Sequence, residues 1–391
     1  MKKKLILEFK KIFGAEGNIH LFFAQGRVNL IGEHTDYNGG HVFPCALTIG
    51  TYLVIRERAD KKICLYSMNF PECPIEEYNL QAIPDEKKDS WTSYPVGIFW
   101  SLQKKGYQIE SGFDMLYYGD IPNGSGLSSS ASIEVVTAFA VSTLCGLGIA
   151  NEEIAKLSQF SENEYNKVNC GIMDQFAVAM GKTDCTIFLD TKTMEYRYAP
   201  IHLENEKIVI MNTKKKRKLG ESKYNERRSQ CQKALELLKK EIDIHELGDL
   251  TEEEFELHKS CIQDPVLMKR AKHAVYENQR TVKAVDALEK GELKLFGKLM
   301  CESHDSLRDD YEVTGIELDT LVEEALKCEG VLGARMTGAG FGGCAVSIVK
   351  SDSVDDVIRK VGKAYKEKIG YDAEFYVVSV GDGPKEFIYQ E

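Results

Sequence analysis

Few features of membrane or secreted proteins are present in this sequence of 391 residues. The longest apolar stretch, residues 135–150, contains Thr and Ser and is too short to cross a bilayer. Only Leu5, Ile6 and Leu7 follow the N-terminal lysines before charged residues return, so a signal-peptide core is not expected. We therefore expect a cytoplasmic protein.

The cysteines lack the spacing of a metal site or a disulfide framework. There are eleven, with no Cys-x-x-Cys pair and no metal-like Cys/His pattern. Their odd number favours a reducing compartment. Cys145 and Cys344 lie in apolar runs, and we expect both to be small buried thiols.

Basic residues are in the minority. Lys and Arg total 50 against 61 Asp and Glu, which gives a formal net charge of −11. A chain this acidic is a poor general ligand for nucleic acid or anionic membranes, so the expected partners are small molecules. We expect a monomer or a weak homo-oligomer. The basic run 214–218 could be a phosphate patch, but nearby acids such as Glu226 favour a solvated surface stretch.

The composition is that of an ordinary globular protein, with 43% hydrophobic and 28% charged residues and no internal repeat. The length favours two domains. Strands and Gly-rich turns characterise the first half, and highly charged helical segments characterise the second. The composition shifts near Glu204, which predicts one domain at 1–204 and another at 205–391.

Short apolar runs predict strands, and longer segments with helical spacing predict helices. The predicted helix 130–147 is apolar on most sides and is expected to be buried. The predicted strands are 52–56, 113–118, 185–189, 208–212, 333–336, 344–349 and 373–380, and the other predicted helices are 221–240, 267–289 and 293–307.

The strongest local motif is a Gly/Ser loop, Ile121–Ser132, between a strand and the buried helix. Free N–H groups at a helix start carry partial positive charge, and glycines let the backbone approach a phosphate closely. The serines of the loop can donate to phosphate oxygens or ligate Mg²⁺. A simple serine N-cap is the alternative. The loop lacks the lysine of a Walker A motif and the third glycine of a dinucleotide fingerprint.

A second segment, 26–40, places five polar residues directly after an apolar strand: Glu33, His34, Thr35, Asp36 and Tyr37. Such a cluster can hydrogen-bond several hydroxyl groups of a neutral polyol. A polar turn with Asn38-Gly39-Gly40 at its tip explains the pattern equally well.

A third segment, 335–344, holds four glycines in six residues between two apolar strands. A hairpin requires fewer. The excess predicts a close approach to a ligand or to another part of the backbone.

Taken together, the three segments resemble the galactokinases, members of the GHMP small-molecule kinase family. Three more segments match in family order, at 170–175, 222–228 and 303–312. The resemblance implies an α+β fold of two domains, with an N-terminal mixed sheet and helices, a C-terminal α/β sandwich and the active site between them. It also implies ATP-dependent phosphorylation of the C1 hydroxyl of D-galactose with Mg²⁺.

The resemblance implies roles for single residues. Asp174 matches the proposed catalytic base, and Arg27 matches the arginine thought to stabilise the transferring phosphoryl group. Ser130 and Glu162 occupy the Mg²⁺-ligand positions. The implied sugar contacts are Glu33, His34, Thr35, Asp36, Gly171 and Tyr224, and the implied ATP contacts are Trp91, Asn123, Gly124, Ser125, Gly126, Leu127, Ser128, Ser129 and Ser130.

Some positions depart from the family pattern. Gln25 replaces the usual Pro, and Asn166-Lys167 replaces the usual Val-Gly near the sugar side, while Asn123 and Ser125 vary around the Gly/Ser loop. A kinase for N-acetylgalactosamine or another sugar is therefore a close alternative. A catalytically silent galactose sensor is another, although the intact Ser129-Ser130-Ala131 argues against it. Whether Asp174 removes a proton or only orients the hydroxyl stays open.

Overall fold

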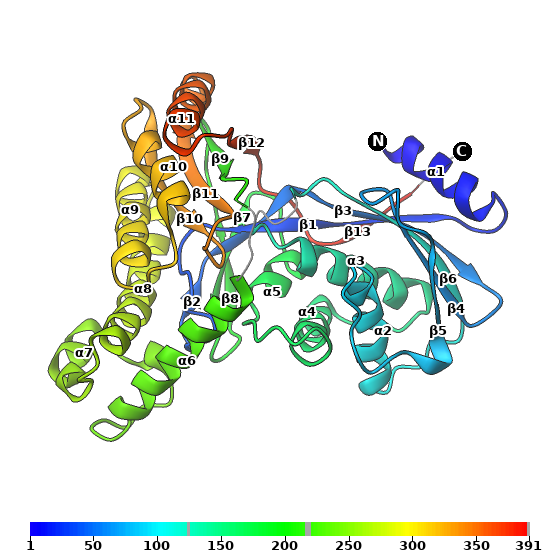
Figure 1. Ribbon diagram of the computed structural model, residues 1–391, viewed down its shortest axis with the longest axis horizontal. Helices are drawn as coiled ribbons and strands as arrows, with labels where there is room; N and C mark the ends of the chain where they lie inside the picture. Colours follow the sequence, from blue (N-terminus) through cyan, green and yellow to red (C-terminus); the bar gives the residue numbers. More distant parts are fainter. Residues whose placement is uncertain (123–125, 216–219, 389–391) are drawn as a thin grey trace.

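The computed structural model describes residues 1–122, 126–215 and 220–388. In Figure 1 the molecule is elongated, with helices α8–α11 at one end and helix α1 at the other. Among the residues described, no helix is both long and apolar enough to cross a membrane. Within the same ranges no disulfide joins two cysteines.

A six-stranded mixed sheet forms the part of the molecule around β1 (Figure 1). Its strand order is β13–β1–β3–β6–β4–β5, and β4 and β6 run parallel while the other neighbours are antiparallel. The strands are β1 (His20–Asn29), β3 (Pro44–Arg58), β4 (Lys62–Ser67), β5 (Glu76–Asn79), β6 (Gly112–Gly119) and β13 (Lys385–Phe387). The mixed sheet expected for the N-terminal part is confirmed.

Helices cover both faces of this sheet. Side chains alternate along each strand, so apolar residues lie on each face and pack against the helices there. Leu21, Val54 and Leu116 face α1 (Lys2–Phe13), which contributes Leu5, Ile6 and Phe9. The alternate residues, such as Phe22 and Leu53, face a larger core. The helices of that core are α2 (Ser93–Lys104), α3 (Ser129–Leu144), α4 (Asn151–Phe160) and α5 (Met173–Ala179).

The second sheet is four-stranded and antiparallel, with the strand order β10–β11–β9–β12. Its strands are β9 (Glu206–Asn212), β10 (Val331–Thr337), β11 (Cys344–Lys350) and β12 (Glu374–Val378). The helices on this side are α6 (Gly220–Leu238), α7 (Glu252–His258), α8 (Pro265–Glu289), α9 (Leu293–Asp309), α10 (Ile316–Leu326) and α11 (Val354–Ile369). This arrangement confirms the expected α/β sandwich.

A further core joins the two sheets, with Val28 and Phe43 packed in one cluster with Ile210 and Phe296. A small sheet of β2 (His41–Val42), β7 (Cys185–Asp190) and β8 (Tyr196–Pro200) lies in the connecting region. Short helical turns complete the described elements: Leu80–Ala82, Ser161–Tyr165, Leu247–Asp249 and Lys259–Cys261. Strand β13 returns to pair with β1, while the boundary at residue 204 stays a prediction.

The predicted elements are present, with shifted ends. The buried helix stops at Leu144, since Gly146 and Gly148 follow with positive φ. Helix α8 begins at Pro265, two residues before the predicted start, because the Asp264 side chain accepts from the backbone N–H of Val266. Cys344 is buried as expected. The expectation for Cys145 was wrong, because it follows the last turn of α3 and is only half-buried.

Candidate active site

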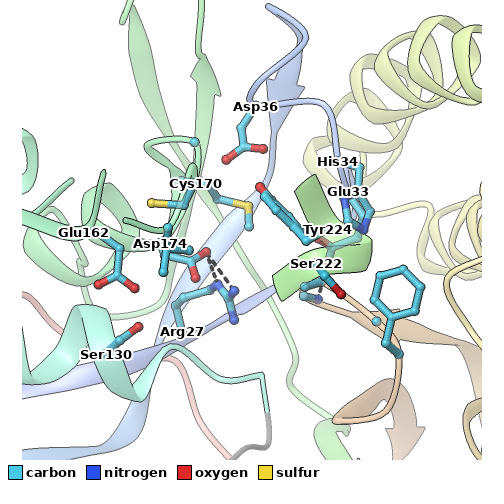
Figure 2. Close-up of a pocket in the computed structure, with 17 residues that line it drawn as sticks. Arg27, Glu33, His34, Asp36, Ser130, Glu162, Cys170, Asp174, Ser222 and Tyr224 are labelled. Atoms are coloured by element: carbon cyan, nitrogen blue, oxygen red, sulfur yellow. Dashed lines mark hydrogen bonds and ion pairs between the residues drawn. The ribbon is translucent and has the colours of Figure 1, made fainter. Parts of the chain in front are cut away.

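A cavity of about 610 Å³ opens where the two sheets meet, and its lining comes from both halves of the chain. Figure 2 shows charged and aromatic side chains pointing into it. The lining residues are Arg27, Glu33, His34, Asp36, Ser130, Glu162, Val168, Cys170, Gly171, Met173, Asp174, Ser222, Tyr224, Gly338, Ala339, Gly340 and Phe341.

An ion pair between Arg27 and Asp174 forms one wall of the cavity (Figure 2). Arg27 donates from Nε to Asp174 Oδ1 over 2.9 Å, and its Nη2 forms an ion pair with the same oxygen over 2.7 Å. The Arg27 side chain is 4% exposed, whereas the Asp174 side chain is 32% exposed. The Arg27 side chain is therefore buried in the wall, whereas the Asp174 carboxylate is accessible from the cavity.

Arg27 meets the Gly/Ser loop next to an irregularity in the pairing of β1 with β3, where β3 carries the extra residues. The register of β1 against β3 shifts between Gln25 and Arg27. Gly26 lies at the shift, and a Cβ there would come within 2.7 Å of the Leu127 carbonyl oxygen. Arg27 then donates from its backbone N–H to Leu127 O and from Nη1 to Gly126 O. Only glycine permits this approach, so the first two motifs pack directly together.

The described part of the Gly/Ser loop leads into α3, which begins at Ser129. The first backbone N–H bonded within the helix is that of Ser132, to Ser128 O, so the preceding amides stand at the positive end of the helix. Ser129 is exposed and Ser130 half-buried. The predicted ATP contacts at Asn123, Gly124 and Ser125 lie outside the described residues.

Ser128 has a different environment from the one its position in the loop suggests. Its Oγ donates to Asp174 Oδ2 over 2.6 Å. Its φ of 59° is in the left-handed region, which is unfavourable for residues with a Cβ. The hydroxyl thus holds the second oxygen of the carboxylate that Arg27 holds by the first. Its predicted contact with ATP stays a prediction.

The third motif closes over the other two. Gly338 has a φ of 82°, and a Cβ there would lie 2.8 Å from the Gly126 carbonyl oxygen. Its backbone N–H donates to Glu33 Oε1 over 2.8 Å. Gly340 approaches the Val313 carbonyl in the same way. The close backbone approach predicted from the four glycines is confirmed.

Residues 32–36, called the polar loop below, contribute Glu33, His34 and Asp36 to the cavity. Asp36 packs so tightly on Gly171 that a Cβ on Gly171 would lie 1.9 Å from Asp36 Oδ2. The pKa of Asp36 is raised to about 7, mainly by burial and to a smaller extent by the negative charges of Asp174 and Glu33. Burial also raises the pKa of Glu33, against the charge of Arg335.

Aromatic residues line the cavity beside the polar loop. The His34 ring lies next to Tyr224, with 5.6 Å between ring centroids, and its Nδ1 is 2.7 Å from the Tyr37 hydroxyl. Burial lowers the pKa of His34 to about 3, so the ring is neutral near pH 7. Neutral imidazole, phenol and carboxylate groups together offer donors and acceptors to a ligand with several hydroxyl groups.

Two oxygen-bearing side chains face each other at the end of the cavity away from the polar loop (Figure 2). They are the Ser130 hydroxyl and the Glu162 carboxylate. Glu162 lies in the π-helical turn Ser161–Tyr165 that follows α4. Within the described ranges no group of three or more His, Cys, Asp or Glu side chains forms a metal site. A hydroxyl and a carboxylate suit Mg²⁺, which usually takes one or two protein oxygens together with phosphates and waters.

The predicted site residues Thr35 and Trp91 have side chains that point elsewhere. The Thr35 side chain is buried, with its hydroxyl 2.9 Å from Gly32 O and 2.7 Å from His41 O. Trp91 packs its ring against Tyr117. In the described part of the chain, neither belongs to the cavity lining. Their predicted contacts with sugar and adenine stay predictions.

Some lining and supporting residues were missed by sequence reasoning. Glu134 is fully buried, one turn after Ser130 on α3. Burial and the charge of Glu162 raise the pKa of Glu134 well above its ordinary value, which favours a protonated carboxyl. A lone acid within the otherwise apolar helix 130–147 was the available signal. Phe341 and Ser222 lie within or next to the matched motifs and also line the cavity.

The basic run agrees with a solvated surface stretch as far as it is described. Lys214 pairs with Glu374 over 2.7 Å, and Lys215 pairs with Glu317 over 2.9 Å. Residues 216–218 lie outside the described residues.

Models of known families match three parts of the chain. The galactokinase galactose-binding signature matches residues 7–57, the N-terminal domain of GHMP kinases matches 93–182, and the C-terminal domain of GHMP kinases matches 284–367. The first two matches contain the polar loop and the Gly/Ser loop.

Curated proteins match over nearly the whole chain. A galactokinase of Clostridium beijerinckii is 58% identical over 97% of both chains, and one of Fusobacterium nucleatum is 54% identical over 98% of this chain and 99% of its own. Among solved structures, Lactococcus lactis galactokinase complexed with galactose matches with a TM-score of 0.97, at 47% identity over 99% of this chain and 100% of that one. Methanococcus jannaschii mevalonate kinase shares the fold at 21% identity, with a TM-score of 0.66.

Proposed function

The chain belongs to the galactokinases, a family of GHMP kinases, and we propose that it transfers the γ-phosphoryl group of ATP to the C1 hydroxyl of D-galactose. The pair Asp174–Arg27 is the observation that carries this proposal. It lies in the cavity with the polar loop on one side and the start of α3 on the other. A hydroxyl group next to Asp174 would therefore face phosphate held at α3.

Asp174 is the acceptor for the reacting hydroxyl. Its oxygens are held by Arg27 and Ser128, which fixes the orientation of the carboxylate. The carboxylate therefore does not need to reorient when the sugar binds. Phosphoryl transfer through a loose transition state depends mainly on alignment and charge neutralisation. Whether Asp174 removes the proton early or orients the hydroxyl until late in the transfer, the same contacts serve both roles.

Arg27 serves the phosphate side. One of its nitrogens, Nη1, donates to Gly126 O in the Gly/Ser loop, while Nε donates to Asp174 and Nη2 forms an ion pair with it. Its positive charge therefore lies between the carboxylate and the loop that would bind the phosphates. Charge growing on the transferring oxygens would be stabilised there without rearrangement of the protein.

The sugar lies against Glu33, His34, Asp36, Gly171 and Tyr224 in this proposal. Carboxylates accept hydrogen bonds from hydroxyl groups, and the Tyr224 hydroxyl and His34 ring can donate or accept. Mixed donors and acceptors of this kind select the positions of hydroxyl groups on a neutral ring. The change to Asn166-Lys167 keeps the related sugar N-acetylgalactosamine as an alternative substrate.

ATP is the phosphoryl donor of this kinase family, and we propose Mg²⁺ as its partner. Ser130 and Glu162 would hold the ion, which neutralises phosphate charge when bound. Backbone amides at the start of α3 would bind phosphate oxygens.

A coupled assay for ADP release tests the proposal. It predicts turnover that requires both galactose and ATP and that stops when EDTA removes divalent cations. Binding of galactose and ATP without turnover would instead favour the silent sensor. The cytoplasmic location and the monomeric or weakly associated state remain predictions, to be checked by cell fractionation and size-exclusion chromatography.

A further inference from the structure

The polar loop needs support from outside itself. It connects β1 to β2 and has no ladder partner of its own, and both Gly32 and His34 adopt positive φ, of 91° and 60°. A histidine in the left-handed region persists only where surrounding contacts fix it. Two of the side chains that reach the cavity, Glu33 and His34, sit on this backbone.

Glu277 on α8 supplies that support. Its Oε1 accepts hydrogen bonds from the backbone N–H groups of Gly32, over 3.0 Å, and Glu33, over 3.2 Å. The same oxygen accepts from the Ser303 hydroxyl over 2.6 Å. The Glu277 side chain is fully buried, and among the residues that the structure describes it is not part of the cavity lining.

The charge of Glu277 is compensated on its far side. Arg280 pairs with Oε2 over 2.5 Å. Burial acts to raise the pKa of Glu277, but the charges of Arg280 and Arg335 and the Ser303 hydrogen bond lower it to about 2. One oxygen is thus paired with Arg280, and the other accepts from two loop amides and from the Ser303 hydroxyl.

Neighbouring residues of α8 hold the same segment. His273 Nε2 lies 3.1 Å from the Glu33 carbonyl oxygen, and Asn278 accepts from the His41 N–H over 2.8 Å. Residues 273 and 277 are one turn apart, so they lie on one face of the helix. That face contacts both the backbone N–H and the carbonyl oxygen of Glu33. Of the two side chains, Glu277 carries charge at neutral pH and His273 is neutral.

We propose that Glu277 is a positioning residue for sugar recognition, which fixes the Gly32–Glu33 backbone and thereby sets Glu33 and His34 in the cavity. The inference rests on the proposed function for the identity of the sugar. It places the effect on sugar binding and leaves ATP binding and the Arg27–Asp174 pair unaffected.

Two conservative variants separate position from charge. Glu277→Asp keeps the charge but withdraws the oxygen by one methylene from the loop amides. Glu277→Gln loses the charge but keeps an acceptor oxygen in place. Losing two hydrogen bonds to a charged acceptor predicts a rise in galactose KM of about tenfold or more for Glu277→Asp. For Glu277→Gln the expected rise is within about threefold, since its hydrogen bonds are retained. The KM for ATP should stay near that of the parent in both.

Hydrogen exchange without sugar provides a second readout. The amides of Gly32 and Glu33 should exchange faster in Glu277→Asp and at the parent rate in Glu277→Gln. Arg280→Gln is the matched control, because it removes the partner of Oε2 and leaves both loop hydrogen bonds. It should lower the melting temperature while the galactose KM stays within about threefold of the parent value.

Three results would overturn the proposal. The first is an unchanged galactose KM in Glu277→Asp. The second is an equal rise in the KM for galactose and the KM for ATP in Glu277→Asp. The third is a tenfold rise of the galactose KM in Arg280→Gln. A tenfold rise of the galactose KM in Arg280→Gln would overturn the proposal even if Glu277→Asp does not fold. If the parent chain does not phosphorylate galactose, the proposed function fails, and unchanged exchange at Gly32 and Glu33 would then refute the positioning role separately.

Discussion

Ser128 offers a test that separates an effect on activity from an effect on stability. Its hydroxyl donates to Asp174 Oδ2 over 2.6 Å while its backbone holds a φ of 59°. Replacement by glycine removes the hydroxyl and also the Cβ that makes this conformation unfavourable. Replacement by alanine removes only the hydroxyl. The two variants therefore share a chemical loss and differ in backbone strain.

The magnitudes follow from these two contributions. A hydrogen bond to a charged group is worth about 1.5–3 kcal/mol, and its loss where Asp174 must be aligned predicts a fall in kcat of roughly 10- to 150-fold in both variants. The left-handed conformation costs about 1–2 kcal/mol with a Cβ, and relief of that cost roughly offsets the lost hydrogen bond in Ser128→Gly. Ser128→Ala keeps the cost, so its free energy of unfolding should fall by the full value of the hydrogen bond, about 1.5–3 kcal/mol.

Steady-state kinetics and denaturant unfolding on the same preparations check both values. The KM for ATP should change little, because the hydroxyl faces Asp174. A kcat for Ser128→Gly within twofold of the parent would show that the Ser128 hydroxyl does not align Asp174 for the reaction. So would a rise in the KM for ATP with kcat unchanged, which would return Ser128 to the phosphate contact predicted from the sequence.

Three further perturbations address the two sides of the cavity. Asp174→Asn should lower kcat by about 10²–10⁴-fold and still be stabilised against heat by galactose; near-normal turnover would remove Asp174 from its role. Because the pKa of Asp36 is raised to about 7, kcat/KM for galactose should fall as the pH drops through 7, and Asp36→Asn should remove that dependence. Because of the same shift, the folded state binds this proton more tightly than the unfolded state. The contribution of Asp36 to the free energy of unfolding therefore falls as the pH rises from 3.8 to about 7. An Asp36→Asn variant with the same dependence of melting temperature on pH as the parent would contradict this expectation. Gly171→Ala should displace Asp36 and raise the galactose KM, whereas Gly119→Ala, whose nearest neighbouring atom is 3.8 Å away, should not.

The sequence predicted those features that depend on local patterns. Helical spacing identified the buried helix that became α3, and its end depends on glycines a few residues away. The four glycines of 338–343 indicated a close backbone approach, and Gly338 meets the Gly126 carbonyl. Motif order indicated the family and, through it, the fold.

Contacts between distant residues were beyond local patterns. Arg27 and Asp174 are 147 residues apart, and Gly32 and Glu277 are 245 apart, so their geometry depends on how the sheets and α8 pack. Ser128 was assigned to phosphate by its place in a motif, although its hydroxyl reaches Asp174. The N-terminal lysines gave no hint that Leu5, Ile6 and Phe9 would form one face of a helix that covers the first sheet.

The central claim is transfer of phosphate to the C1 hydroxyl of galactose. A sugar panel under saturating ATP and Mg²⁺, with the product analysed by ³¹P and ¹H NMR, tests it most directly. We expect galactose to have the highest kcat/KM and its product to carry phosphate on C1. A higher kcat/KM for N-acetylgalactosamine, or phosphate at any other position, would contradict it.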